Sequence, residues 1–262
     1  MLEIVSPDDR TFVNGMTITL ITICYNSAAT IEDTIKSVLA QDFKDIEYII
    51  KDGGSTDGTL DILKKYEDQL KWVSKKDKGI YSAMNQGLEL ASGEIIGLLN
   101  ADDFYADNEV LSRVAKVFED SKVGAAYSDL QYVDSQDTNK IIRNWQAGTY
   151  DHSNFLKGWM PPHPTFFLRK EFYDRFGFFR EEFASAGDYE LMLRMLYKHE
   201  IKAVYIPIVQ IKMRAGGVSN MSLKNRIRAN KEDRKAWKIN GIKPKWYTLW
   251  WKPLSKVFQW LN

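Results

Sequence analysis

The first 105 or so residues of the chain alternate between apolar runs and segments with apolar residues at helical spacing. Residues 17–23, 46–50 and 95–99 are rich in β-branched and aliphatic side chains, which is typical of buried strands. Residues 31–39 and 80–91 instead carry apolar side chains with the period of an amphipathic helix. Strands that alternate with helices favour a parallel sheet, so an α/β fold with a mostly parallel central sheet flanked by helices is predicted.

The second half of the chain has a less regular pattern. Further strands are expected at 72–74, 125–133, 141–145 and 203–208, and further helices at 110–118 and 191–197. Residues 158–164 contain three prolines, which exclude both a helix and a central strand. This segment is therefore expected to be an irregular loop, and such loops on α/β sheets often bind ligands.

Asn100, Ala101, Asp102 and Asp103 directly follow the buried run that ends at Leu99. Ligands of open α/β sheets bind at the carboxyl ends of the strands. Two adjacent carboxylates repel each other unless a positive charge holds them, and a hard divalent cation with oxygen ligands is a natural candidate. The alternative is that the aspartates cap the next helix, because Asp is favoured at helix starts.

Asp52 ends the second apolar run and opens a loop that is rich in glycine. Ser55 stands where a dinucleotide-binding fingerprint has its second glycine, and Thr59 stands where a P-loop has lysine, so neither motif is present. A carboxylate at a strand end can still accept a hydrogen bond from a base or a ribose. The alternative is a plain turn, because Asp, Gly and Ser are common turn residues.

Charge and composition exclude several classes of protein. The net charge of +1 argues against a general nucleic-acid binder, and the single cysteine, Cys24, is expected to be an inert core residue. Residues 1–15 lack the features of a secretory signal, and no apolar run is long enough to span a bilayer. Residues 224–262, however, hold eleven Lys and Arg against two acidic residues, a net charge of +9, and five of the eight tryptophans. A boundary is therefore expected near residues 220–222.

Five blocks in order make the chain recognisable. They are residues 21–26 (ITICYN), 34–41 (TIKSVLAQ), 52–59 (DGGSTDGT), 77–87 (DKGIYSAMNQG) and 99–103 (LNADD). Together they resemble the opening of a family 2 glycosyltransferase of the bacterial polysaccharide-biosynthesis type. The resemblance covers about residues 17–219. It implies a GT-A fold and an inverting transfer of sugar from a nucleotide-activated donor, most often a UDP-sugar.

The resemblance also implies which residues bind the donor. The nucleotide would be held by Thr22, Tyr25, Asn26, Asp52, Gly53, Asp77, Lys78, Asn85, Asn100 and Ala101. Asp102 would hold a divalent metal, manganese or magnesium, and Asp103 would touch the donor sugar or cap the following turn. Many relatives have Asp where this chain has Asn100. An amide adds no negative charge, so the resemblance places metal ligation mainly on Asp102.

An inverting transfer needs a carboxylate that takes the proton from the acceptor hydroxyl. Asp188 stands at the place of the family's catalytic aspartate, with Glu190 as the second choice and a helix cap as the alternative role for Asp188. His163, in the proline-rich loop, is a candidate contact to phosphate or a structural residue. Arg214 precedes two glycines and either approaches the leaving diphosphate or forms an ordinary salt bridge.

These features predict a metal-dependent glycosyltransferase that acts on a glycan or lipid-linked acceptor in surface polysaccharide biosynthesis. Two alternatives are a non-catalytic nucleotide-sugar-binding protein, suggested by Asn100, and a sugar nucleotidyltransferase, which would need a glycine-rich basic loop that residues 25–30 lack. The catalytic domain is expected at 1–222, with a nucleotide-binding half at 16–105 and an acceptor half at 106–222.

Residues 223–262 are expected to form a helical, basic and aromatic tail. Tryptophan and tyrosine favour the headgroup layer, and Lys and Arg are attracted to anionic lipid. The tail therefore predicts a cytoplasmic protein that lies peripherally on the inner face of the plasma membrane. The alternative is that the tail aromatics pack on the catalytic domain or form a homodimer contact.

Overall fold

The computed structural model describes residues 15–216, 223–245 and 248. The strands are β1 (Ile18–Cys24), β2 (Ile46–Asp52), β3 (Lys71–Ser74), β4 (Ile95–Leu98), β5 (Asp103–Tyr105), β6 (Ala125–Val133), β7 (Ile141–Trp145), β8 (Phe167–Arg169) and β9 (Ala203–Arg214). The α-helices are α1 (Ile31–Leu39), α2 (Thr59–Lys64), α3 (Ile80–Leu90), α4 (Val110–Phe118), α5 (Lys170–Phe176), α6 (Gly187–Met192) and α7 (Leu223–Ile239). Three shorter helical segments are η1 (His152–Lys157), η2 (His163–Thr165) and the π-helical η3 (Leu193–Lys198).

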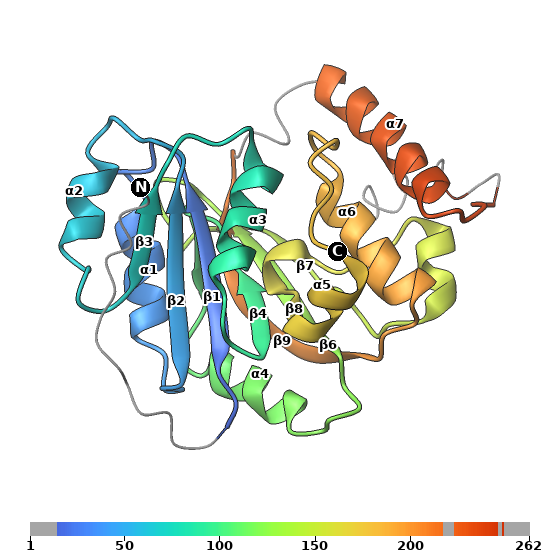
Figure 1. Cartoon of the computed structure of the whole chain (residues 1–262), viewed down its shortest axis with the longest axis horizontal. Helices are drawn as coiled ribbons and strands as arrows, with labels where there is room; N and C mark the ends of the chain where they lie inside the picture. The colour runs from blue at the N-terminus through green and yellow to red at the C-terminus, as the bar shows by residue number, and fades with distance from the viewer. Residues whose placement is uncertain (1–14, 217–222, 246–247, 249–262) are drawn as a thin grey trace.

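One mixed sheet forms the centre of the molecule (Figure 1). Its strand order is β3-β2-β1-β4-β8-β6-β9-β5, and β7 pairs with β6 outside this path. The pairings among β1, β2, β3 and β4 are all parallel, as the alternating sequence pattern predicts. In the second half, β6 and β9 are parallel, while β8, β5 and β7 pair antiparallel with their neighbours. The α/β fold expected from the sequence is thus confirmed.

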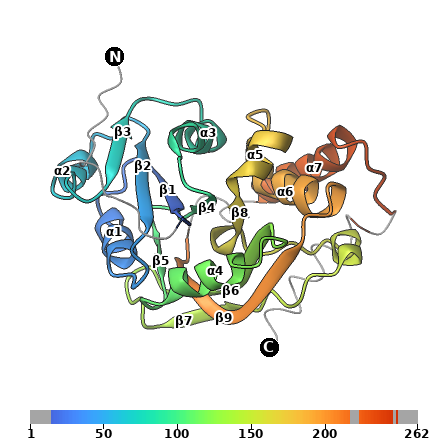
Figure 2. The ribbon, with the colours of Figure 1, turned by 60° about the horizontal axis from the view of Figure 1, so that its bottom comes forward.

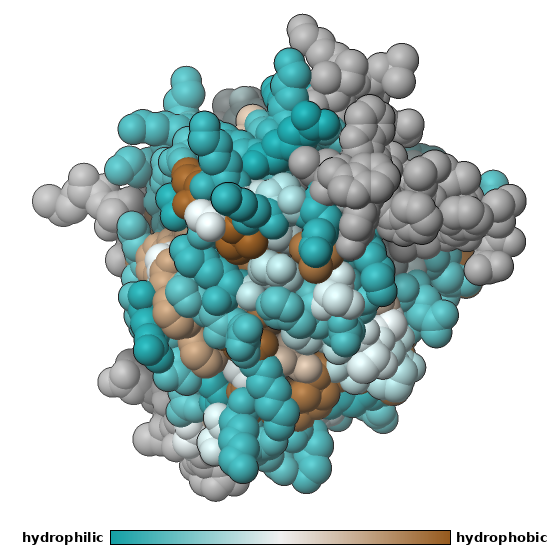
Figure 3. Space-filling view, turned by 90° about the vertical axis from the view of Figure 1, so that its right-hand side faces the viewer, coloured by the Kyte–Doolittle hydropathy of each residue, from teal (hydrophilic) through white to brown (hydrophobic). Residues whose placement is uncertain are grey.

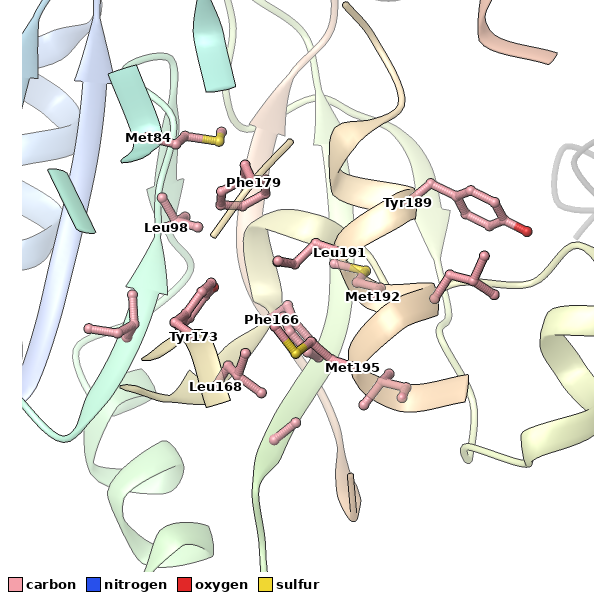
Figure 4. Packing of buried hydrophobic residues seen from close by; sticks show 14 of the residues in the cluster. Met84, Leu98, Phe166, Leu168, Tyr173, Phe179, Tyr189, Leu191, Met192 and Met195 are labelled. Atoms are coloured by element: carbon pink, nitrogen blue, oxygen red, sulfur yellow. The ribbon is translucent and has the colours of Figure 1, made fainter. Parts of the chain in front are cut away.

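The sheet separates two hydrophobic clusters. Leu20 and Ile21 are neighbours in β1 and point to opposite faces, so each joins a different cluster. One cluster contains side chains of α1 and α4, and the other contains side chains of α3, α5 and α6 (Figure 2). In the second cluster, Met84 of α3, Leu98 of β4 and Leu191 of α6 point toward a common centre (Figure 4). This packing fixes α3 and α6 on one face of the sheet.

The structure changes three of the expected elements. Asp103 begins the short strand β5, which pairs antiparallel with β9, whereas the sequence indicated a loop or a helix cap there. Strand β9 does not end at Ile208 but continues to Arg214, because the register with β6 skips Pro207 and Ile208 in a bulge. The helix expected at 191–197 begins four residues earlier, at Gly187, and continues into a π-helical segment.

Helix α7 packs against α6 through fully buried Ala236 and Trp237. The boundary expected near residues 220–222, and the aromatic residues Trp246, Trp250, Trp251 and Trp260, lie outside the described residues. Within the described ranges, none of the helices combines the length and the apolar character needed to cross a membrane.

Candidate active site

The predicted site residues gather at the edge of the sheet where the parallel strands end. The carboxyl ends of β1 and β2, the start of α3 and the loop before α6 all lie at the upper end of the molecule in Figure 1. Strand β4 runs parallel to β1 and delivers Asn100 to Asp103 to the same edge. Open α/β sheets bind ligands at this edge.

Asp52 is fully buried and organises the loop that follows β2. Its carboxylate accepts hydrogen bonds from the backbone N–H of Gly54 and Ser55, at 2.8 and 3.0 Å, and from the hydroxyl of Ser74 at 2.6 Å. Burial raises the pKa of Asp52, but hydrogen bonds from Ser55, Ser74 and Gly54 outweigh it and hold the pKa below its usual value. The structure therefore gives Asp52 a role in shaping the loop, and its contact with a nucleoside stays a prediction.

Tyr25, Gly53 and Asp77 lie next to one another in the expected nucleoside site. The ring of Tyr25 is 65% exposed, although most large hydrophobic residues of the protein are buried. A Cβ on Gly53 would lie 2.9 Å from the Oδ2 atom of Asp77 and 3.3 Å from the Tyr25 ring. A larger residue at position 53 would therefore require the Asp77 side chain to move, so glycine suits the close approach of these two side chains.

A buried lysine that sequence reasoning did not single out stands behind Asp77. Lys51 is 1% exposed, lies 3.7 Å from the Asp77 carboxylate and donates hydrogen bonds to the carbonyl oxygens of Asp52 and Lys75. Burial lowers the pKa of Lys51, and the charges of Asp77 and Asp52 partly oppose this. The sequence feature that could have identified Lys51 is a lysine near the end of a mostly apolar strand, β2.

Two other predicted nucleotide contacts, Thr22 and Asn26, have partners within the protein. Thr22 is fully buried, and its hydroxyl hydrogen-bonds to that of Tyr48 at 3.1 Å. Asn26 adopts a left-handed φ of 50°, and its side-chain oxygen accepts the Thr56 N–H at 2.9 Å. Lys78 is exposed at the start of the turn before α3. The structure brings Asn26 and Lys78 to the site edge and places the Thr22 side chain in the core.

Asn85 has a different role in the structure from the nucleotide contact expected for it. Its Nδ2 donates to the carbonyl oxygen of Phe179 at 2.9 Å, and its Oδ1 accepts the Phe179 N–H at 3.0 Å. The amide thus pairs with a backbone unit 94 positions away and ties α3 to the loop that precedes α6. Both of its hydrogen-bonding atoms are used in this connection.

The segment from Asn100 to Asp103 contains two carboxylates with different surroundings. Asp103 is 1% exposed and accepts a hydrogen bond from the Nδ2 atom of Asn100 at 2.8 Å. Burial and the neighbouring Asp102 raise the pKa of Asp103 well above its usual value. Burial also raises the pKa of Asp102, although its own N–H and Arg214 oppose this. Neither aspartate caps a helix, because Glu109 is the N-cap residue of the next helix, α4.

Arg214, at the end of β9, reaches this segment. It is 8% exposed, donates to the carbonyl oxygen of Asp102 at 2.8 Å and forms an ion pair with Asp33 of α1. Its guanidinium also lies over the ring of Phe104, 4.9 Å from the centroid. The structure therefore brings Arg214 to the aspartate segment and confirms a salt bridge for it, while its approach to the leaving diphosphate stays a prediction.

The aspartate segment fits a divalent cation that is shared with a phosphate ligand. No other residue in the described ranges hydrogen-bonds to the Asp102 carboxylate, and burial disfavours its negative charge. In the same part of the chain, no three His, Cys, Asp or Glu side chains converge on one point. Mg²⁺ and similar hard cations are commonly held by one or two carboxylates together with substrate phosphates and water. A lone carboxylate at a strand end is compatible with that arrangement.

Asp188 stands in the first turn of α6 with an available carboxylate. The N-cap position belongs to Ala186, so the alternative that Asp188 is the helix cap is wrong. No side chain in the described ranges forms an ion pair or a hydrogen bond with the Asp188 carboxylate. Tyr81 of α3 holds the helix start instead, because its hydroxyl accepts the Gly187 N–H at 2.8 Å. Nothing in the sequence singled out Tyr81, because Gly187 is 106 positions away.

His163 is the first residue of the short helix η2 and lies close enough to Asp188 of α6 to interact with its charge. Its Nε2 is buried and has no hydrogen-bond partner among the residues that the structure describes. Burial lowers the pKa of His163, while the charge of Asp188 partly opposes the shift. The ring packs edge-on against Phe179 at 5.9 Å, and Phe179 stacks on Tyr81 at 5.7 Å. The buried imidazole is therefore held against an aromatic ring, where the charge of Asp188 reaches it.

Glu190, the second choice for the base, is fully buried and hydrogen-bonded to two arginines and an asparagine. Its Oε1 accepts hydrogen bonds from Arg180, Arg194 and Asn240 at 3.0–3.1 Å, and its Oε2 accepts one from Arg194 at 2.9 Å. Such a carboxylate cannot reach an acceptor hydroxyl without breaking two ion pairs. The structure thus separates the roles of the two acidic residues of α6.

The chain is similar in sequence to several known proteins. A family model described as glycosyl transferase family 2 matches residues 19–199. The chain is 35% identical over 126 residues to an uncharacterized glycosyltransferase of Nostoc sp., which covers 47% of this chain and 39% of that protein. It is 29% identical to chondroitin synthase of Escherichia coli over 69% of this chain and 27% of that enzyme. A PGL/p-HBAD biosynthesis glycosyltransferase of Mycobacterium bovis is 29% identical over 74% of this chain and 76% of its own length. The chain therefore spans less than half of the first two relatives.

Solved structures share the fold. TarS of S. aureus, in complex with UDP-GlcNAc, superposes with a TM-score of 0.64 at 19% identity over 86% of this chain and 65% of that one. A mannosyltransferase of Pyrobaculum calidifontis, in complex with GDP-Man and Mn2+, superposes with a TM-score of 0.65 at 20% identity over 92% of this chain and 73% of that one. At this level of identity the likeness establishes the GT-A fold, which the sequence resemblance implied.

Proposed function

Because the chain belongs to glycosyl transferase family 2, we propose that it transfers a sugar from a nucleotide-sugar donor to an acceptor hydroxyl with inversion at the anomeric carbon. The observation that carries the proposal is the contrast between two acidic residues of α6. Glu190 is enclosed by cations, whereas Asp188 presents a carboxylate without an ion pair in the described chain. In one displacement the acceptor oxygen bonds to the anomeric carbon, the bond to the diphosphate breaks, and Asp188 takes the acceptor proton.

The donor nucleotide is proposed to lie against Tyr25, Asn26 and Gly53, with Asp77 and Lys78 beside it. The exposed ring of Tyr25 offers a stacking surface, and its neighbours at this strand edge are polar. A UDP-sugar is the favoured donor because TarS, a protein of the same fold, was crystallised with UDP and with UDP-GlcNAc. GDP-mannose, which the archaeal mannosyltransferase binds, is the second choice.

We further propose that Asp102 holds Mn²⁺ or Mg²⁺ together with the donor diphosphate. Asn100 and the buried Asp103 support the segment, and Arg214 anchors it through the Asp102 carbonyl. When bound, the cation supplies charge neutralisation for the departing nucleoside diphosphate. The residues of this chain would then keep the diphosphate at the carboxyl end of β4.

A thermal-shift panel tests donor binding. UDP, GDP and CDP are each added with and without MnCl₂, because a ligand that binds the native state raises the melting temperature. A selective rise with UDP that depends on manganese is expected. A rise of equal size with all three nucleotides, or with none of them, would contradict the proposed donor site.

Replacement of the proposed base tests the chemistry. Asp188→Asn keeps the shape of the side chain and removes the base, so turnover of a nucleotide sugar should fall by at least about 10²-fold while nucleotide affinity stays unchanged. Slow hydrolysis of UDP-GlcNAc, followed as release of UDP, provides an assay that needs no acceptor. A wild-type protein that binds UDP-GlcNAc tightly and never hydrolyses any nucleotide sugar would instead be a binding protein. NMR of the transferred sugar should show an inverted anomeric configuration.

The acceptor is proposed to be a lipid-linked glycan, and the basic tail to hold the enzyme on the inner face of the plasma membrane. Two relatives are named for chondroitin synthesis and for PGL/p-HBAD biosynthesis, which both concern glycan assembly. On α7 the side chains of Arg228, Lys231, Arg234, Lys235 and Lys238 are all exposed. Each such charge near anionic lipid contributes about 1 kcal/mol to binding.

Liposome sedimentation tests this placement. The full chain should bind liposomes that contain anionic lipid, and less so as the salt concentration rises. A chain that ends after Asn240 keeps α7 and its buried Trp237, so it should stay folded and bind nucleotide but bind liposomes more weakly. If the full chain ignores anionic liposomes at low salt, the tail belongs to the protein core or to a homodimer contact.

For the division of the chain, we propose a catalytic domain at 1–222. Residues 16–105 would form its nucleotide-binding half and residues 106–222 its acceptor half. The tail would begin at 223, with α7 as its first part.

A further inference from the structure

The loop that leads into α6 closes around a carboxylate from α7. The Oε2 atom of Glu232 accepts hydrogen bonds from the backbone N–H groups of Ser185 and Ala186, at 2.8 and 2.9 Å. It also accepts the Ser185 hydroxyl at 3.1 Å and the Ala184 N–H at 3.2 Å. Four donors from three successive residues therefore converge on one oxygen atom.

The donors of residues 184–186 that surround the Glu232 carboxylate, called the cradle below, lie directly before helix α6. The first N–H groups of a helix have no partner within the helix and are usually satisfied by the side chain of the N-cap residue. The N-cap residue of α6 is Ala186, which has no side-chain acceptor. Glu232, from 46 positions further along the chain, instead accepts the N–H groups of this N-cap residue and of the two residues before it, and its negative charge also suits a helix start.

Two further contacts from α7 hold the residues that follow Asp188. The indole N–H of Trp237 donates to the Tyr189 hydroxyl at 2.9 Å, and Asn240 donates to Glu190 at 3.0 Å. The ring of Tyr189 extends from α6 away from the centre of the hydrophobic cluster (Figure 4). Residues 184–186, 189 and 190 are thus all held by α7, while Asp188 between them keeps an available carboxylate.

The charge pattern of α7 supports a specific role for Glu232. The tail has only two acidic residues, Glu232 and Asp233, and both lie on the side of α7 that meets the rest of the protein, with Asp233 only 4% exposed. The exposed positions between them and the end of the helix are basic, and Figure 3 shows a mostly hydrophilic surface on this side of the molecule. A carboxylate within so basic a segment is therefore placed where the α6 loop needs an acceptor.

We propose that Glu232 is the positioning residue for the catalytic base and that docking of α7 sets the location of the Asp188 carboxylate. The inference rests on the proposed function, because it takes Asp188 as the base. Asp188 follows the cradle by two residues, so release of the loop displaces its backbone directly. Displacement of a reacting group by about 1 Å can cost 10²-fold in rate.

Two variants separate the acceptor atom from its charge. Glu232→Ala removes the acceptor of all four donors and should lower turnover of UDP-GlcNAc with Mn²⁺ by roughly 10-fold to 10²-fold, with the affinity for UDP unchanged. Glu232→Gln keeps one oxygen atom for the same donors and should stay within about threefold of the wild-type turnover. Glu182→Gln removes an exposed carboxylate from the same loop region and serves as the charge-matched control, with wild-type turnover expected.

A double-mutant cycle identifies the route of the effect. In the Asp188→Asn background the turnover no longer depends on where the carboxylate lies, so Glu232→Ala should cost less than about twofold more. Additive losses would overturn the inference, because they would mean that Glu232 acts by some route other than Asp188. If Asp188→Asn alone keeps its turnover, the base assignment fails. If Asp188→Asn is impaired while Glu232→Ala is as active as the wild type, the positioning role fails.

Amide hydrogen exchange provides a readout that needs no substrate. In the wild-type chain the N–H groups of Ser185 and Ala186 should exchange slowly, and Glu232→Ala should accelerate their exchange while α3 keeps its protection. Unchanged exchange at these two amides would contradict the cradle. A general acceleration across α3 and α6 would show a loss of stability instead of a local release, and would also reject the positioning role.

Discussion

The clearest stability prediction concerns Glu190, the engaged carboxylate of α6. Glu190→Gln keeps the size of the side chain but removes its negative charge from between Arg180 and Arg194. Arg194 is only 3% exposed, so its guanidinium would lose its counter-ion in a site that water does not reach. Loss of one partner from a buried ion pair typically costs about 3–5 kcal/mol.

Two features of the site reduce this cost. The Arg180 side chain is 36% exposed and can turn toward solvent. Arg194 also donates to the carbonyl oxygens of Phe176, Gly177 and Phe178, which remain in the variant. We therefore expect a loss near the lower limit, about 3 kcal/mol. For a chain of this size, that corresponds to a fall in melting temperature of roughly 6–12 °C.

Thermal melts followed by circular dichroism, together with urea titrations, measure the loss. Asp188→Asn is the matched variant in the same helix, and its melting temperature should stay within about 2 °C of the wild type because its carboxylate holds no partner. Turnover should show the opposite order, with Glu190→Gln retaining most of its activity per folded molecule. If Glu190→Gln melts like the wild type and loses turnover with nucleotide affinity intact, the two carboxylates have been assigned the wrong roles.

Three further predictions follow from the site. Asp102→Ala should abolish turnover and remove the manganese dependence of UDP binding measured by calorimetry; metal-dependent turnover that persists in this variant would reject the metal assignment. Asn100→Asp adds a third carboxylate to the segment and removes the amide that donates to Asp103. It should therefore tighten Mn²⁺ binding but lower the melting temperature of the metal-free protein. Because the pKa of Asp52 is lowered in the folded state, its contribution to stability is present above the usual carboxyl pKa and is lost as the pH falls through the folded-state pKa. Asp52→Asn should therefore have a lower melting temperature than the wild type at neutral pH, and its melting temperature should fall less on acidification. Parallel plots of melting temperature against pH for the two proteins would contradict this. Gly187→Ala would place a Cβ 2.7 Å from the ring of Tyr81 and should cost about 1–3 kcal/mol in urea unfolding, and an unchanged midpoint would show that the ring can move.

Much of the secondary structure could be predicted from the sequence, because its pattern is local. The strands at 125–133 and 141–145 have the expected bounds, and the helix at 110–118 also agrees. Hydrophobic periodicity reports which faces are buried, and it needs no knowledge of the partner segment. The same pattern placed the polar residues of the expected site at the ends of parallel strands, where the structure has them.

The limits of sequence reasoning appear where a residue's partner is remote. The family resemblance placed Asn85 among the nucleotide contacts, but both polar atoms of its amide pair with the backbone of Phe179. Strand β9 continues beyond Pro207 because β6 accommodates a bulge, and only the pairing of the two strands reveals this. The tail looked like a separate basic segment by composition, yet Trp237 buries its indole against the catalytic body.

The sequence by itself determined the α/β class, the order of most strands and helices, and the residues proposed for donor binding, metal binding and proton transfer. Only the tertiary structure decided which of them are available for chemistry. It enclosed Glu190 between two arginines and left Asp188 open, and it brought Glu232 to the amides that precede α6. The physical reason is that availability depends on desolvation and hydrogen-bond partners, and these partners are supplied by segments far away in the chain.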